Sequence, residues 1–274
     1  MRLARPVPKL ALAALLAVPL LAVPIAADAH RPWLEPSSTV LSGTDAWVSF
    51  DAGVSTDPFI RDHAPMQLGG LVVTAPDGSH PAVENQARGR FRSVFDVHLN
   101  QPGTWRITVM NEGFFGSWRQ NGEQRRFRGT REAFEREVPA NAEGLRATAM
   151  IGRIETFATL GRPTTENLQP TGRGLELVPV THPNDLTAGA ESRFRLVLDG
   201  APAAGVDVTV IPGGTRYRER PNEIRARTAA DGSFAVTLPE PGLYWLGASV
   251  RDDKSGIPNV MRNASYNATL EVLP

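Results

Sequence analysis

The sequence predicts an all-β protein built from two antiparallel β-sandwich domains with a short helix between them. Its 274 residues contain 25 glycines and 23 prolines, and its apolar segments are short and alternate with polar residues. Both features favour many short strands joined by tight turns. The dipeptide Asp231-Gly232, which lies between two such segments, adds a strong hairpin signal.

Residues 1–29 have the parts of a secretory signal peptide. Three basic residues precede an apolar run over residues 10–26, and Ala27-Asp28-Ala29 provides the small residues of a cleavage site. We therefore expect the mature chain to begin at His30. We also expect it to be exported, with the periplasm as its compartment.

An N-terminal domain is expected over residues 30–160. Alternating apolar residues predict strands over 46–50, 71–75, 91–99, 104–110 and 153–160. In the third of these strands the alternation places four residues on the core face: Phe91, Phe95, Val97 and Leu99. The stretch 161–174, which is rich in proline, threonine and glycine, is the expected linker between the domains.

The segment 121–142 interrupts the strand pattern. Thr130 is a suitable N-cap, and the apolar residues after it recur on one helical side, so a short helix is expected between 128 and 140. The mixed charges of this segment are typical of a solvated surface. Binding of an acidic ligand by its arginines is the alternative interpretation, and it involves Arg125, Arg126 and Arg128.

A C-terminal domain is expected over residues 175–274. Six apolar runs predict its strands, at 175–180, 194–198, 206–211, 233–238, 243–248 and 269–273. One face of these strands forms the predicted core: Phe194, Leu196, Val208, Val210, Phe234, Val236, Tyr244 and Leu246.

Composition excludes several classes of function. The 29 lysines and arginines balance 29 aspartates and glutamates, and no basic stripe is interleaved with aromatic residues, so nucleic acid is not an expected partner. No apolar run after residue 29 is long enough to span a membrane. The absence of cysteine excludes disulfides, thiolate metal sites and cysteine nucleophiles. The sequence also lacks a Gly-x-Ser-x-Gly elbow and a phosphate-binding loop.

A histidine at a free N-terminus offers two nitrogens to one cation, the α-amine and the ring Nδ1. Imidazole suits copper, nickel and zinc, and affinity for nitrogen donors peaks at copper. Copper and nickel are therefore the candidate ions for His30, with Cu(II) bound more tightly than Ni(II) or Zn(II). The alternative is that His30 is only a polar chain end, and cleavage after Ala27 would remove the chelate.

The other histidines have no short spacing that would form a contiguous metal motif, so the fold has to assemble any site. His63 follows Asp62 in a loop-like stretch, and we expect it to join His30. His98 and His182 are the further candidate ligands. The alternative for His98 is a solvated strand position paired with Asp96 or a neighbouring strand, and that for His182 is a structural turn.

The chain resembles known protein families at two levels. Residues 199–250, with "TAADGSFAVTLPEPGLYWLGASV" towards their end, resemble prealbumin-like and carboxypeptidase-regulatory-like β-sandwich modules, which implies a prealbumin-like C-terminal domain. Together with the strand pattern of the N-terminal half, the expected class is two immunoglobulin- or prealbumin-like sandwiches. Together with "AHRPWLEPSSTVLSG" and "GLELVPVTHPNDL", nearly the whole mature chain resembles the DUF4198 family of exported proteins, formerly labelled nickel or cobalt uptake components. The family's opening pattern corresponds to His30, Trp33, Leu34 and Pro36, and a second pattern to Asp62, His63 and Pro65. The resemblance implies export and a link to metal uptake, but no catalytic residues.

The sequence therefore predicts a periplasmic, non-enzymatic protein that binds a transition metal ion or metal chelate and serves an envelope transport system. Two alternatives stay open. One is a structural or partner-binding module of the cell envelope. The other is a copper oxidase with an N-terminal histidine brace, which requires a second histidine close to His30.

Overall fold

The computed structural model describes residues 30–274, so the predicted signal peptide and its cleavage site lie outside the described residues. The described part is almost entirely strand, with one α-helix and two short 3₁₀ turns. None of its helices combines the length and apolar character needed to cross a membrane. The prediction of an all-β protein is confirmed.

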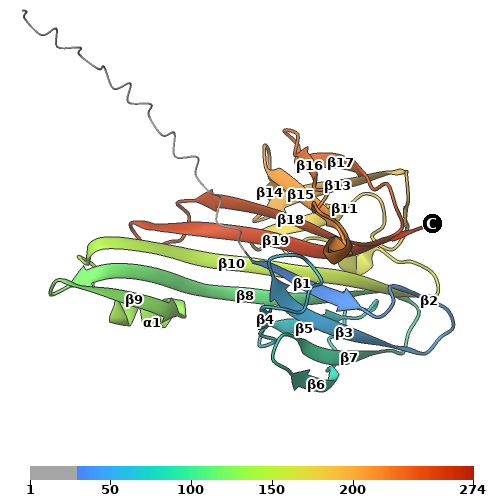
Figure 1. Cartoon of the computed structure of the whole chain (residues 1–274), viewed down its shortest axis with the longest axis horizontal. Coiled ribbons are helices and arrows are strands. Elements are labelled where there is room, and N and C mark those ends of the chain that lie inside the picture. Colours follow the sequence, from blue (N-terminus) through green and yellow to red (C-terminus); the bar gives the residue numbers. More distant parts are fainter. Residues whose placement is uncertain (1–29) are drawn as a thin grey trace, which may run out of the picture.

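The strands form three sheets (Figure 1). The N-terminal sheet contains β1 Arg31–Pro36, β3 Ala46–Ser55, β4 Ala64–Pro65, β6 Glu84–Arg88 and β7 Ser93–Leu99. The C-terminal sheet contains β11 Leu175–Pro179, β13 Glu191–Leu198, β14 Ala201–Pro202 and β17 Ser233–Thr237. The central sheet contains β2 Val40–Leu41, β5 Leu71–Thr74, β8 Gly103–Gln120, β9 Glu123–Gly129, β10 Glu143–Leu160, β12 Leu186–Thr187, β15 Asp207–Pro212, β16 Ile224–Arg227, β18 Gly242–Asp252 and β19 Val260–Leu273.

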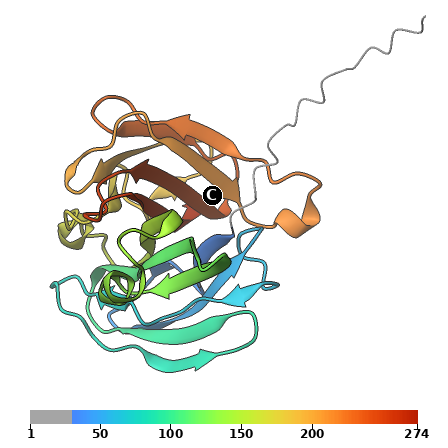
Figure 2. The ribbon, with the colours of Figure 1, turned by 90° about the vertical axis from the view of Figure 1, so that its left-hand side faces the viewer.

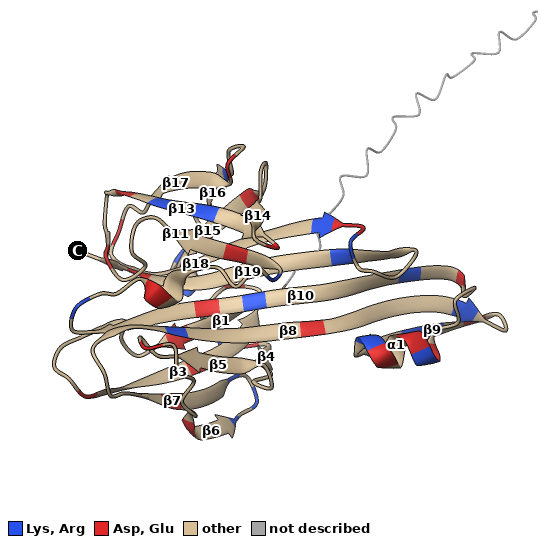
Figure 3. Ribbon diagram, turned by 180° about the vertical axis from the view of Figure 1, so that it is seen from behind, with Lys and Arg blue, Asp and Glu red and all other residues tan. Residues whose placement is uncertain are grey.

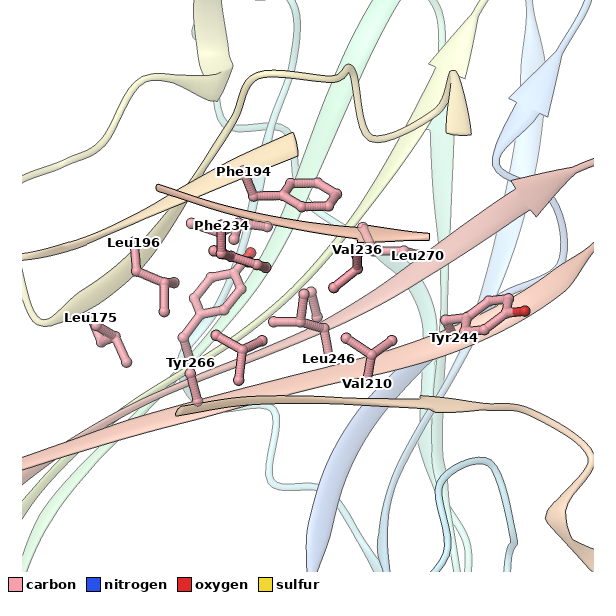
Figure 4. Packing of buried hydrophobic residues seen from close by; sticks show 14 of the residues in the cluster. Leu175, Phe194, Leu196, Val210, Phe234, Val236, Tyr244, Leu246, Tyr266 and Leu270 are labelled. Carbon is pink, nitrogen blue, oxygen red and sulfur yellow. The ribbon is translucent and has the colours of Figure 1, made fainter. Parts of the chain in front are cut away.

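Each outer sheet packs on a different part of the central sheet, which gives two lobes (Figure 2). Under the N-terminal sheet, the core includes Phe50, Phe95, Trp105 and Ile107. The core under the C-terminal sheet contains all eight residues predicted for it, and Figure 4 shows several of them meeting between the layers. The predicted C-terminal core is confirmed because strand alternation alone determines which side chains face inward.

The two lobes share one sheet, and the prediction of purely antiparallel pairing is wrong. β10 runs parallel to β19, with Ala147 opposite Val260 and Thr156 opposite Thr269. These strands are far apart in the sequence, so no turn between them signals the contact. A local pattern of apolar residues predicts that a strand exists, but it does not specify the strand's partner or direction.

Several local predictions also need correction. Phe91 lies outside β7 and is exposed, while Phe95, Val97 and Leu99 are buried as expected. Asp231-Gly232 forms a tight turn, but it joins β16 of the central sheet to β17 of the C-terminal sheet. The turn chemistry is therefore as predicted, and the hairpin is not, because the chain crosses between layers at this point.

The predicted helix is present as α1, Arg131–Glu137, and Thr130 is its N-cap, as expected. The helix does not lie between the two lobes. It packs on the far part of the central sheet, where Phe134 contacts Phe114 and Phe127 from β8 and β9. Strand β9 itself lies inside the segment that was expected to be free of strands. Its row of arginines obscured the alternation that indicates a strand.

A buried ion cluster joins the linker, 161–174, to the middle of the central sheet, where acidic and basic positions meet (Figure 3). Glu155 is fully buried and accepts hydrogen bonds from Arg106 Nε at 2.9 Å, Arg153 at 3.1 Å and the Tyr266 hydroxyl at 2.9 Å. Glu176 lies 3.2 Å from Arg153 and also accepts hydrogen bonds from linker backbone N–H groups. Two carboxylates thus neutralise two buried guanidinium groups.

Candidate functional site

The structure places two predicted metal ligands side by side. His30 immediately precedes β1, and His63 ends the loop between β3 and β4. Their rings are stacked with centroids 3.8 Å apart and planes 13° from parallel. Both side chains lie close to the surface, where the N-terminal strand meets the central sheet. Two imidazoles more than thirty residues apart in the sequence are therefore within reach of one ion.

Two tryptophans hold the start of β1, next to His30, against the rest of the fold. Trp33 of β1 is fully buried, and its indole N–H donates to Ser55 Oγ at 2.8 Å. Trp245 of β18 donates from its indole N–H to the Pro32 carbonyl oxygen at 2.9 Å, which ties β1 to the central sheet. Each indole covers a glycine, Gly53 and Gly247 respectively, and a Cβ at either glycine would overlap the ring. Two buried, hydrogen-bonded indole rings therefore hold the start of β1 in place.

The loop that carries His63 is fixed by Phe59. Its side chain is buried and meets Trp33 edge to face at 5.9 Å, in a cluster that includes Ile211 and Trp245. Phe59 also has a backbone φ of 66°, which is uncommon for a bulky residue and carries strain. The surrounding packing holds this conformation and thereby anchors the loop four residues before His63.

Charged groups surround the pair. Arg61 donates from Nε to Asp51 at 2.8 Å, also pairs with Glu35, and lies over the Trp33 ring. Burial raises the pKa of Glu35; Arg61 opposes this effect and Asp51 adds to it. On the other side, Arg31 lies over Trp245 and reaches Glu223. These ion pairs lie on both sides of the histidine pair and do not involve its rings.

Within residues 30–274, His30 and His63 differ from the other three histidines in that neither of their two ring nitrogens has a hydrogen-bond partner. Neither ring makes a hydrogen bond within residues 30–274. In contrast, His98 binds Asp45 and stacks on Trp47, and Nδ1 of His80 contacts the Val73 carbonyl oxygen. A metal ligand needs an available nitrogen lone pair, and His30 and His63 are the two described histidines whose rings lie against each other with every ring nitrogen unengaged.

The two further candidate ligands, His98 and His182, do not join this pair. His98 is a half-buried strand residue whose partner is Asp45, just before the neighbouring strand, and not Asp96. The Asn184 N–H donates to Nδ1 of His182 at 3.1 Å, so the proton is on Nε2, which donates to the Thr164 carbonyl oxygen. Both nitrogens of His182 are thus committed to structure, as its alternative interpretation as a turn residue supposed.

The half-buried position of His182 leads to a pH prediction. Burial lowers the pKa of His182 from its ordinary 6.5. As the pH falls, the unfolded chain therefore takes up this proton at a higher pH than the folded protein does. The stability that His182 contributes above pH 6.5 is lost as the pH falls toward its folded-state pKa. We expect thermal melts to be lower at about pH 5.5 than at about pH 7.5. The difference should shrink in His182→Gln, and an equal difference in that variant would contradict this assignment.

Within residues 30–274, no group of three or more histidine, aspartate or glutamate side chains has the geometry of a metal site. The pair supplies two donors, and a third protein nitrogen is the α-amine of His30 once the chain begins there. Sequence reasoning identified the two histidines but missed the support under them. Trp33 was visible in the opening motif, whereas the roles of Phe59 and Trp245 depend on contacts across the fold.

Comparison with known proteins gives one family match. The profile described as a domain of unknown function, DUF4198, matches residues 27–252. No curated protein matches the chain.

Three of the similar solved structures have low sequence identity and low TM-scores. The D0–D1 domain of intimin is 10% identical, with 88% of this chain and 97% of that chain covered and a TM-score of 0.23. A DUF4785 family protein from Legionella pneumophila is 8% identical over 78% of this chain and 50% of that one, with a TM-score of 0.24. An ICAM-5 D1–D4 ectodomain fragment is 13% identical over 88% and 50%, with a TM-score of 0.21.

Proposed function

The chain belongs to the DUF4198 family, and from this premise we propose that it is an exported, periplasmic protein that binds a transition metal ion or metal chelate through His30 and His63. The observation that carries the proposal is the stacked pair of imidazoles, 3.8 Å apart, whose ring nitrogens have no other described partner. In this role the protein is not an enzyme, and it passes its cargo to an envelope transport system.

The donor set favours late first-row ions. Two imidazoles and one amine are nitrogen ligands, which suit copper, nickel and zinc, and the affinity order peaks at copper. With three protein donors, a bound ion keeps open coordination positions. Those positions leave room for a chelating small molecule or for ligands of a receiving protein, which is what a carrier requires. In the stacked arrangement the ring lone pairs lie in nearly parallel planes, so binding of one ion by both imidazoles requires the side chains to reorient.

Calorimetric titration with Cu(II) and with Ni(II) tests the role of His63. In protein that begins at His30, we expect His63→Ala to weaken Cu(II) binding by about tenfold or more, because a direct ligand matters at least as much as an outer-shell partner. His98→Ala is the matched control: it also removes a surface imidazole, and it should leave the affinity unchanged. Equal affinities in the wild type and in His63→Ala would overturn the assignment of His63.

The same pair also favours a second candidate, a copper oxidase with an N-terminal histidine brace, because His63 is the second histidine beside His30. The two functions differ in turnover. Copper-loaded protein that consumes oxygen in the presence of ascorbate, with loss of that activity in His63→Ala, would favour the oxidase. Metal binding without turnover favours the carrier.

A further inference from the structure

A second surface of chemical interest lies on the far part of the central sheet. There β9, β8, β10, β19 and β18 extend beyond the N-terminal sheet, and no further layer covers the side of the sheet on which that outer sheet packs (Figure 1). We call this uncovered side the open face. The register puts Arg128 and Thr148 opposite Phe115, and Arg251 opposite Asn263, so these side chains lie on one side of the sheet.

Strand alternation determines which side chains point to the open face. Phe114, Trp118, Ala147 and Ala149 point to the other side, where α1 buries them. Their neighbours along the strands therefore point to the open face. Phe115 is 37% exposed, a large value for a phenylalanine in the middle of a sheet.

Two adjoining hollows lie on the open face. One, of about 490 Å³, is lined by Phe115, Thr148, Met150, Arg251 and Asn263. The other, of about 540 Å³, also contains Phe115 and Thr148 and adds three arginines, Arg126, Arg128 and Arg146. Neither lining contains an aspartate or glutamate. The face thus has an apolar centre with positive charge at both edges.

The four arginines of the open face lack acidic partners. Arg126, Arg128, Arg146 and Arg251 make no ion pair or hydrogen bond within the described part of the chain. The guanidinium of Arg128 lies over the Phe115 ring at 5.1 Å, which orients it without neutralising it. Arginines elsewhere are often paired, as Arg61 is with Asp51 and Arg262 with Asp252. The four guanidinium groups therefore leave uncompensated positive charge on this face.

We propose that the open face binds an acidic peptide segment of a partner protein. Aromatic residues, methionine and arginine are the residues enriched in protein interfaces, while aspartate and glutamate are depleted. Arginine suits carboxylates because its planar fork donates two parallel hydrogen bonds. Stacking of Arg128 on Phe115 reduces the freedom that the side chain loses on binding. The exposed Phe115 and Met150 would contact apolar residues of the same segment.

The dimensions favour a segment over a whole domain. From β9 to β18 the face crosses four strand spacings, which is about 19 Å at about 4.8 Å each. An extended peptide of about six residues spans this distance at about 3.4 Å per residue. The proposal is independent of the histidine pair, since neither His30 nor His63 lines these hollows.

Fluorescence anisotropy with a defined probe tests the proposal. The probe is a labelled peptide of about ten residues in which aspartate alternates with phenylalanine and leucine. We expect wild-type protein to bind it about tenfold or more tightly than the same peptide with lysine in place of aspartate. The double variant Arg126→Glu with Arg128→Glu should weaken binding of the acidic peptide by about tenfold or more.

Arg88→Glu with Arg90→Glu provides the matched control. Arg90 also lies over an exposed phenylalanine, Phe91, at 5.5 Å, and the two arginines are again two residues apart. This variant should stay within about twofold of the wild type, and both variants should melt like it because the altered side chains are exposed. Equal weakening by both variants would overturn the proposal. So would tight binding of dextran sulfate or phosphatidylglycerol vesicles without binding of the acidic peptide.

Discussion

Replacement of Glu155 by alanine is expected to destabilise the fold by about 3–5 kcal/mol, because removal of one partner from a buried ion cluster leaves charge without compensation. Glu155 is fully buried and accepts hydrogen bonds from Arg106, Arg153, Thr108 and Tyr266. In Glu155→Ala only Glu176 remains to balance two guanidinium groups. Urea unfolding followed by circular dichroism measures the loss.

An exposed ion pair supplies the control for Glu155. Arg227 and Asp207 lie 2.8 Å apart on the surface, with exposed side-chain fractions of 66% and 79%. Asp207→Ala should change the free energy of unfolding by about 1 kcal/mol or less, as is usual for exposed pairs. If Glu155→Ala costs no more than Asp207→Ala, the cluster is not what holds the linker to the sheet.

The same cluster adds to the acid sensitivity of the protein at pH values below those at which His182 acts. Burial alone would raise the pKa of Glu155, but Arg106 and Arg153 outweigh it and hold the pKa below its ordinary 4.5. The folded-state pKa is thus lower than the unfolded one. The stabilisation is complete above about pH 4.5 and is lost as the pH falls toward the folded-state value.

Local features of this fold were predictable from the sequence, and long-range ones were not. The C-terminal core follows from alternation in the strands around Phe234 and Leu246, and Thr130 is recognisable as a cap by its residue type and position. The parallel contact between β10 and β19 leaves no local trace. The buried carboxylates and guanidinium groups of the ion cluster look like ordinary surface charges in the sequence, because only the fold shows that they are buried.

The candidate site shows the same division. His30 and His63 were selected as residues with suitable chemistry near a predicted chain start and in a loop. Their adjacency depends on Trp33, Trp245 and Phe59, whose contacts join β1, β18 and the loop before β4. His98 and His182 have the same side chain, but Asp45 engages one nitrogen of His98, and both nitrogens of His182 make hydrogen bonds. Contact between two histidine rings therefore separates His30 and His63 from the others, and no sequence pattern reports it.

A blocked N-terminus is expected to have the largest effect on metal binding. In the proposed site the free α-amine of His30 and its ring Nδ1 bind one ion together, so a preceding residue would remove the chelate while leaving both imidazoles in place. We expect a loss of Cu(II) affinity of about 100-fold or more, beyond the effect of an outer-shell change. Affinity should also fall with decreasing pH, since both donors bind only when deprotonated.

The most direct test of the metal proposal is calorimetric titration of Cu(II) into two forms of the protein. One form begins at His30, and the other retains one additional methionine before it. The proposal predicts tight binding, at one ion per chain, in the first form and a loss of about 100-fold or more in the second. Equal affinity in the two forms would show that the free N-terminus takes no part, and would favour a structural or partner-binding module.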